Sequence, residues 1–294
     1  MSLLPSATEI LFAVGAGDDV VGVTFECDFP PDARSRRIVS TTSLSSGLTP
    51  AEIDAEVRER VAAGEDLYHL DEGALRTIDP DLVVTQDLCA VCAVDVKNVD
   101  DALTHLGCRA QVLTLDPMTL DDVLDSIVQV GRATGKEEHA AGVVAGLRER
   151  LACVATAVTG LPRPRIAALE WTDPPYSSGH WVPDMVEAAG AVSALGASGT
   201  RSSRITWDDV TAAAPDLVVV APCGYGIDDT RRLARDLVGA QVLPSSAPVW
   251  AVDANSVFVR PGPRIVDGIE VLAHIAHPDV APQVDSLAVR VYTP

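Results

Sequence analysis

The sequence predicts an α/β protein with two similar lobes joined by a long helical segment. Short apolar runs rich in β-branched residues alternate with helical patterns, as in parallel sheets that are buried on both faces. A short helical pattern followed by Pro-Asp-Leu-Val-Val occurs once in each half, at 80–84 and 215–219. Between the halves, helical spacing of apolar residues extends from Thr119 to Val158, which is too long for an ordinary connection.

The first half contains clear start signals for its helices. Ser6 with Glu9 fits a capping box, so we expect a helix from Ser6 to about Val14. Thr49 followed by Pro50 is typical of a helix start, because threonine caps and proline fits the first turn. The expected elements after the first helix are strands at 20–24, 82–85 and 111–115 and helices at 50–63, 72–78 and 95–106.

The second half repeats this scheme after the long helical segment, which Gly135 interrupts. A short helix is expected at 208–214, and strands are expected at 165–169, 217–221 and 249–252. The predicted organisation is therefore an N-terminal lobe at 1–117, a linking backbone helix at 118–160 and a C-terminal lobe at 161–294.

Polar, aromatic and sulfur-containing residues cluster where the predicted strands end. Ligands of open parallel sheets lie beyond the carboxyl ends of the strands, so these residues are expected to line a binding cleft. The segments concerned are Phe25–Asp28, Gln86–Cys92, Glu170–Pro175, Pro222–Gly226 and Asp253–Asn255.

Composition and charge exclude some classes of partner. The formal charge of −20 argues against nucleic acid, which requires basic patches. No apolar stretch is long enough for a membrane span. A secretory signal is not recognisable at the N-terminus, so the chain as it stands is expected to be cytoplasmic, or extracytoplasmic if a leader was removed.

Aromatic residues are the leading candidates for ligand contact. Only 4% of the chain is aromatic, yet Trp171, Trp181 and Tyr225 all fall in predicted strand-end loops. Such rings suit a large, flat, partly apolar ligand, although each tryptophan would equally fill the core of a lobe. His180 lies between Gly179 and Trp181, where its imidazole would bind a metal, contact a ligand or bond within its loop.

The cysteines and carboxylates leave several alternatives open. Cys89 and Cys92 form a CxxC motif, which fits a redox pair, half a metal site or ordinary thiols. Together with His180 they are the candidate metal ligands, and Cys27 or Cys223 would join them only through tertiary proximity. Glu26 and Glu170 would contact a ligand or cap helices. The sequence contains no serine-hydrolase elbow, Walker loop or HExxH motif, so we expect no enzyme.

Several segments resemble those of a known family. They are Ser2–Leu11, Val20–Thr24, Glu26–Asp28, Gln86–Cys92, Glu170–Pro175, Gly179–Pro183, Pro222–Gly224 and the two Pro-Asp-Leu-Val units. They resemble the helical-backbone substrate-binding proteins of ABC importers, in particular the vitamin B12 (cobalamin)-binding branch. The resemblance implies two Rossmann-like lobes joined by a rigid helix, with a cobalamin or related corrinoid ligand between the lobes and an ABC transporter permease as partner.

The resemblance also suggests which positions bind the ligand. The candidate ligand-binding residues are Glu26, Cys27, Gln86, Cys89, Cys92, Glu170, Trp171, His180, Trp181, Cys223 and Tyr225. Many relatives carry histidine where this chain has Phe25, so we expect no ligand role at that position. In relatives that dock on a permease, an acidic residue on each lobe makes the contact; the matching positions here are Asp208 and Gly73, with Glu72 beside the latter.

Two functions follow from these patterns. The first is a corrinoid-binding protein of the ABC-importer type, for uptake or for handling the ligand inside the cell. The alternative is a metal- or redox-dependent protein on the same fold, which would use the thiols and His180.

Overall fold

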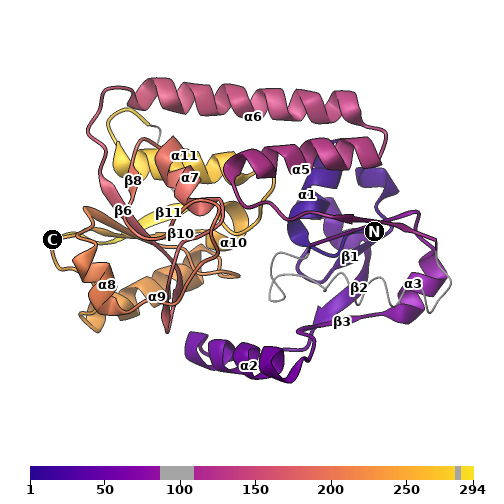
Figure 1. The fold of residues 1–294 in the computed structure, drawn as a ribbon, viewed down its shortest axis with the longest axis horizontal. Helices are drawn as coiled ribbons and strands as arrows, with labels where there is room; N and C mark the ends of the chain where they lie inside the picture. Colours follow the sequence, from indigo (N-terminus) through magenta and orange to yellow (C-terminus); the bar gives the residue numbers. More distant parts are fainter. Residues whose placement is uncertain (87–108, 282–285) are drawn as a thin grey trace. The chain divides into compact units, whose positions relative to one another are not determined.

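A computed structural model describes residues 1–86, 109–281 and 286–294 of the chain as a mixed α/β structure (Figure 1). The chain divides into two compact units. Unit 1 consists of Met1–Pro117 and Leu124–Ala145, and unit 2 of Met118–Val123 and Gly146–Pro294. The predicted helix at 95–106 lies outside the described residues.

The strands of unit 1 are short. They are β1 (Gly22–Thr24), β2 (Arg37–Thr42), β3 (Tyr68–Leu70), β4 (Leu82–Thr85) and β5 (Gln111–Thr114). The pairs β1–β2 and β4–β5 are parallel, whereas β3 runs antiparallel to β2. The first residues of the chain join the two groups of strands, since Ser2 N donates to Gly22 O and Leu3 N to Val84 O, both at 2.9 Å.

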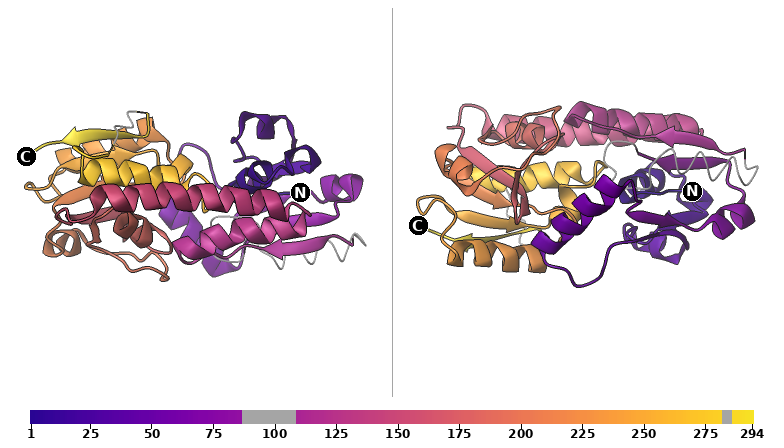
Figure 2. Two further views of the ribbon diagram at one scale, coloured as in Figure 1. Left: turned by 90° about the horizontal axis from the view of Figure 1, so that it is seen from above. Right: turned by 60° about the horizontal axis from the view of Figure 1, so that its bottom comes forward.

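The helices of unit 1 begin where the local sequence predicts, except that α1 begins one residue earlier than expected. The elements are α1 (Pro5–Ala13), α2 (Pro50–Ala63), α3 (Glu72–Ile78) and the short 3-10 helices η1 (Gly17–Asp19) and η2 (Pro31–Ser35). The predicted cap at Ser6 is wrong, because Pro5 already occupies the first turn and Leu4 is the cap residue. Helix α2, drawn from two further sides in Figure 2, begins with the full capping box of Thr49 and Glu52. None of its residues is buried.

The predicted long helix is divided into α5 (Leu120–Ala133) and α6 (Glu137–Val158). Gly135 between them has φ = +66°, a left-handed conformation that ends helices and that glycine adopts without strain. Near the turn the two helices approach closely, because a Cβ added to Gly131 would lie 2.4 Å from Ala140 Cβ.

Unit 2 is organised around a six-stranded sheet. Its order is β11-β10-β9-β6-β7, and β8 pairs with β6. Strands β6, β8, β9 and β10 run parallel along their pairings, whereas β7 and β11 are antiparallel to their neighbours. The strands are β6 (Arg165–Thr172), β7 (Pro175–Ser177), β8 (Val192–Ser193), β9 (Leu217–Val220), β10 (Val249–Val252) and β11 (Ala288–Tyr292).

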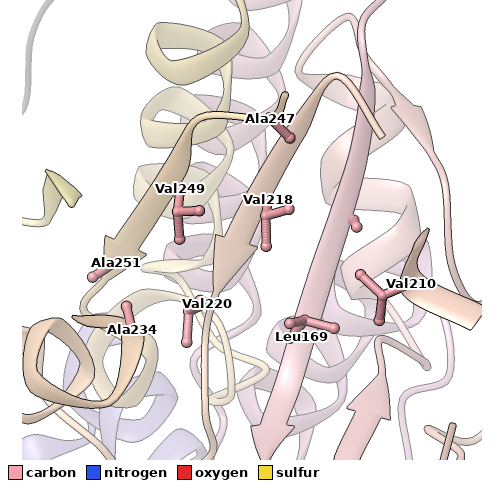
Figure 3. Close-up of a cluster of buried hydrophobic side chains, with 9 residues drawn as sticks. Leu169, Val210, Val218, Val220, Ala234, Ala247, Val249 and Ala251 are labelled. Atoms are coloured by element: carbon pink, nitrogen blue, oxygen red, sulfur yellow. The ribbon is translucent and has the colours of Figure 1, made fainter. Parts of the chain in front are cut away.

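Helices cover both faces of this sheet (Figure 1). Helices α7 (Val182–Ala188) and α11 (Ile265–Ala276) pack on each other, while α8 (Trp207–Ala212) and α9 (Ile227–Gly239) supply side chains to the opposite core. The short helix α10 (Ala254–Val257) follows β10. Figure 3 shows that core, in which Val210 of α8 lies beside Leu169 of β6 and Ala234 of α9 lies near Val220 of β9. None of the helices in the described ranges combines the length and the apolar character that crossing a bilayer requires.

The internal repeat has the same local structure in both units. Asp79 and Ala214, each just before Pro-Asp, have φ = +46° and +44°. In both cases the chain then enters a strand, β4 or β9, whose last three residues are buried. The repeated sequence therefore specifies one helix–turn–strand unit that is used twice.

Candidate functional site

An aromatic surface lies at the carboxyl end of the unit 2 sheet. Because β6, β9 and β10 are parallel, their carboxyl ends share one edge. Trp171 near the end of β6 and Tyr225 after β9 stand at this edge, with ring centroids 5.7 Å apart and planes tilted by 59°. Asn255 in α10, after β10, donates its N–H to Tyr225 O at 3.0 Å. We call Trp171 and Tyr225 the unit 2 aromatic pair.

The chemistry of this pair suits a ligand with apolar and polar parts. Both residues are partly exposed, so their rings are held in place yet remain accessible. Burial raises the pKa of Tyr225, so its phenol stays protonated at neutral pH. The Trp171 indole N–H donates to Asp173 O at 3.1 Å, which fixes the ring. The pair therefore offers flat apolar area together with a neutral hydroxyl.

Glu170 connects the loops next to this pair. Its buried carboxylate accepts from Gly179 N at 2.9 Å through Oε1 and from the Ser202 hydroxyl through Oε2. Its backbone oxygen accepts from Cys223 N at 3.1 Å. Each of these contacts joins β6 to a different loop, so Glu170 acts as a structural anchor for the strand-end edge.

His180 is held in a strained conformation by its backbone. Its φ of +51° lies in the left-handed region that non-glycine residues rarely adopt. The loop over-determines this conformation, because His180 N donates to Thr200 O at 2.6 Å and Gly199 N donates to His180 O at 3.2 Å. Nε2 is buried without a hydrogen-bond partner, so metal coordination through this atom would require the ring to move.

Trp181 lies in the core of unit 2, which is the alternative that the sequence left open. Its side chain is only 7% exposed. The indole N–H donates to Phe258 O at 2.8 Å, 77 residues further along the chain. The neighbouring His180 ring packs against it with centroids 5.6 Å apart. In this arrangement Trp181 presents little surface to a ligand and supports the loop instead.

The folded state is expected to lose stability as the pH falls, partly through His180. Burial, and secondarily the charge of Arg201, lower the pKa of His180 below its usual value near 6.5. The unfolded chain therefore takes up a proton first, and the free energy of unfolding decreases as pH falls through 6.5 towards the folded-state pKa.

Urea unfolding at pH 7.5 and 5.5 checks this expectation. The stability difference between the two pH values should shrink in His180→Gln and persist when the exposed His69 is changed to Gln. An equal difference in the wild type and His180→Gln would contradict it.

The unit 1 candidates lie at the carboxyl ends of β1 and β4. Cys27 is buried, with Sγ 3.0 Å from Thr8 Oγ1. Glu26 accepts a long hydrogen bond of 3.5 Å from the Tyr68 hydroxyl. Gln86, directly after β4, is buried. Unit 1 thus has its own polar strand-end edge.

Support for a metal centre is lacking in the part of the chain that the structure describes. Residues 1–86, 109–281 and 286–294 contain no group of three or more His, Cys, Asp or Glu side chains placed to hold a metal ion. Cys223 is exposed, and Cys89 and Cys92 lie outside the described residues. The metal and redox roles of the CxxC motif stay predictions.

Three residues that shape the site carry no signal in the sequence pattern. Ser202 binds Glu170, Phe258 receives the Trp181 indole, and Tyr68 contacts Glu26. All three contacts join residues that are 32 or more positions apart, so no local pattern marks them.

Comparisons with known proteins agree with this geometry. Residues 1–259 match the family described as periplasmic binding protein. The cobalamin-binding protein of Halobacterium salinarum is 27% identical over 94% of this chain and 69% of its own length.

Two solved structures share the fold. The periplasmic vitamin B12 binding protein of Vibrio cholerae has a TM-score of 0.67 at 21% identity, covering 92% of this chain and 93% of that one. A periplasmic heme-binding protein from Pseudomonas aeruginosa has a TM-score of 0.73 at 18% identity, covering 99% of this chain and 97% of that chain.

The family and these neighbours are binding proteins, which confirms the prediction of a binding function rather than an enzyme. The match covers most of the sequence and both units. This chain therefore belongs to the periplasmic binding protein family.

Proposed function

We propose that this chain is the substrate-binding protein of an ABC-type importer and that its ligand is a corrinoid. The observation that carries the proposal is the unit 2 aromatic pair at the carboxyl-end edge of a largely parallel sheet. This is where ligands of such sheets bind. Relatives named cobalamin-binding or vitamin B12-binding protein support the choice of ligand.

A corrinoid matches the chemistry of this edge. Its ring system is large and flat, and its rim carries amide groups that both donate and accept hydrogen bonds. The Trp171 and Tyr225 rings supply contact area, and the Tyr225 hydroxyl supplies a neutral polar group. A neutral rim is also compatible with a chain of formal charge −20, whereas an anionic ligand would meet a negative potential.

Heme is the second candidate ligand. It is favoured by the solved heme-binding proteins of the same fold, one of which holds two hemes. Heme is equally flat but carries two carboxylates, so the negative net charge of this chain disfavours it relative to a corrinoid.

Absorbance titrations with aquocobalamin and with hemin distinguish these candidates. We expect saturable binding of aquocobalamin and weaker or no binding of hemin. Replacing Trp171 by Leu should weaken cobalamin binding by about 1–3 kcal/mol, by analogy with the loss of one stacking ring in nucleic-acid complexes.

Trp207→Leu is the matched control, because Trp207 begins α8 and packs against the core. The Trp207→Leu variant should bind cobalamin with the same affinity as the wild type. Wild-type protein that binds neither ligand would contradict the proposal, and an unchanged affinity of Trp171→Leu would contradict the assignment of the aromatic pair.

The role in import needs a separate test. Vesicles containing a candidate permease should take up labelled cobalamin only when this protein is added.

The alternative function, a metal- or redox-dependent protein that uses its thiols, is tested by metal analysis of the purified protein. Stoichiometric metal that is lost in Cys89→Ser would support this alternative.

A further inference from the structure

Two buried hydroxyl groups occupy paired positions on β1 and β2 of unit 1. Thr24 is the last residue of β1 and is the direct partner of Ser40 in β2. Each of the two residues is only 1% exposed. Neither Thr24 Oγ1 nor Ser40 Oγ makes a hydrogen bond to any residue in the ranges 1–86, 109–281 and 286–294. We call Thr24 and Ser40 the unit 1 hydroxyl pair.

The strand pairing is irregular at this pair. The register shifts by one residue between Val23 and Thr24, so β2 has one additional residue, Val39, just before Ser40. Such a bulge disrupts the hydrogen-bond ladder locally and bends the strand that contains it. Val39 is completely buried in the hydrophobic core of unit 1, which holds the additional residue in place. The unit 1 hydroxyl pair therefore stands where the two strands are least regularly bonded.

Two unbonded hydroxyls at this point would oppose folding strongly. One unsatisfied buried hydroxyl lowers the folding equilibrium constant by about 5- to 150-fold. Ordering one water molecule lowers the same constant by at most about 30-fold, and often by much less. A single water that bonds to both hydroxyls removes two penalties and adds one smaller one. The folded state is therefore favoured when a water occupies this position.

The strand geometry also suits a water molecule. Neighbouring strands lie about 4.8 Å apart, whereas two O–H···O bonds in series span at most about 5.6 Å. A divalent cation fits less well, because it takes six or more oxygen ligands, usually with carboxylates among them. No group of three or more His, Cys, Asp or Glu side chains is placed to hold a metal ion in the described parts of the chain. The low exposure of both residues excludes a larger ligand.

We propose that the unit 1 hydroxyl pair binds one internal water molecule, which bridges β1 and β2 at the bulge. The inference is independent of the proposed function, since it involves no ligand of the strand-end edges. The backbone of the same two residues holds the segment that follows β1. Thr24 O accepts from Cys27 N at 3.0 Å, and Ser40 O accepts from Phe25 N at 3.1 Å. The bridging water thus fixes the two residues that position Phe25 and Cys27.

Urea unfolding of a variant without one hydroxyl tests the proposal by the direction of the change. Thr24→Val keeps the shape of the side chain and should raise the unfolding equilibrium constant about 2- to 12-fold, because the water loses one of its partners. A hydroxyl without any partner would give the opposite result, since its removal relieves a penalty. Thr41→Val, at an exposed neighbouring position in β2, is the matched control and should change the constant at most about 2-fold.

A double-mutant cycle tests whether the two hydroxyls share one water. Ser40→Ala alone should also raise the unfolding equilibrium constant. In the double variant Thr24→Val/Ser40→Ala the loss should be smaller than the two single losses combined, because the water leaves together with both of its partners. Strictly additive losses would contradict a shared water.

A high-resolution crystal structure of the wild type gives a readout that does not depend on variants folding. We expect a water oxygen within hydrogen-bond distance of both Thr24 Oγ1 and Ser40 Oγ, and its loss in the double variant. Hydroxyls that bond to each other or to another protein group, or that have no water between them, would overturn the inference. Because these experiments use no corrinoid, such a result would leave the proposed function standing.

Discussion

Replacing Gly179 by Ala is expected to lower the free energy of unfolding by about 3 kcal/mol, through overpacking against backbone. A Cβ at this position would lie 2.3 Å from Ser202 N and 2.7 Å from the carbonyl carbon of Arg201. Both atoms belong to the backbone of the loop whose Thr200 O accepts a hydrogen bond from His180 N. Neither this loop nor the segment with Gly179 can therefore move away without breaking that hydrogen bond. Urea unfolding monitored by circular dichroism measures the effect.

Gly146→Ala provides a control of opposite sign. Gly146 is exposed within α6, and no atom lies within 4 Å of its added Cβ. Because alanine favours the helix, this variant should gain about 0.5–1 kcal/mol. If Gly179→Ala were as stable as the wild type, the close approach of the Gly179 backbone to the backbone of Arg201 and Ser202 would be contradicted.

Removing the Glu170 carboxylate should have a comparably large effect. Glu170→Ala leaves the Gly179 N–H and the Ser202 hydroxyl without their acceptor, and hydrogen bonds to a charged group contribute about 1.5–3 kcal/mol each. We expect a loss of about 3–6 kcal/mol of stability for the two bonds together. Cobalamin binding should weaken too, since the anchored loops flank the unit 2 aromatic pair.

Two further variants identify the cause of that loss. Glu170→Gln keeps an oxygen for Gly179 N and should lose only about 1 kcal/mol. Glu187→Ala removes an exposed glutamate that pairs with Arg163, and surface pairs contribute less than about 1 kcal/mol. Equal losses in Glu170→Ala and Glu187→Ala would show that Glu170 is not an anchor.

Local patterns predicted the strands that have their own apolar runs, whereas β2, β3, β7, β8 and β11 were not predicted. The observed β4 and β10 have the bounds expected from their apolar runs, and α2 begins where Thr49 and Pro50 indicate. The start of α1 was placed at Ser6 because capping was weighed without Pro5, which fits the first turn by itself. The interruption of the linking helical segment at Gly135 was predicted, and the structure has there a close turn between α5 and α6.

The site was less predictable, because its contacts depend on tertiary pairing. The meeting of Trp171 with Tyr225 follows from the parallel order of β6 and β9, whose carboxyl ends share the edge where ligands of such sheets bind. No local pattern distinguishes Trp181 in the core from Trp171 at the edge, since the difference arises from the bond to Phe258 O. The contact of Tyr68 with Glu26 was not predicted either. The position of Tyr68 depends on the pairing of β3 with β2, which the sequence of β3 alone does not indicate.

We propose that a corrinoid binds at the strand-end edge of unit 2, on the aromatic pair of Trp171 and Tyr225. Native mass spectrometry tests it most directly, after incubation of the protein with equal amounts of aquocobalamin and hemin. We expect a complex of one protein and one cobalamin, which is depleted in Trp171→Leu and unaffected in Trp207→Leu. Protein that stays free, or that carries hemin instead, would contradict it.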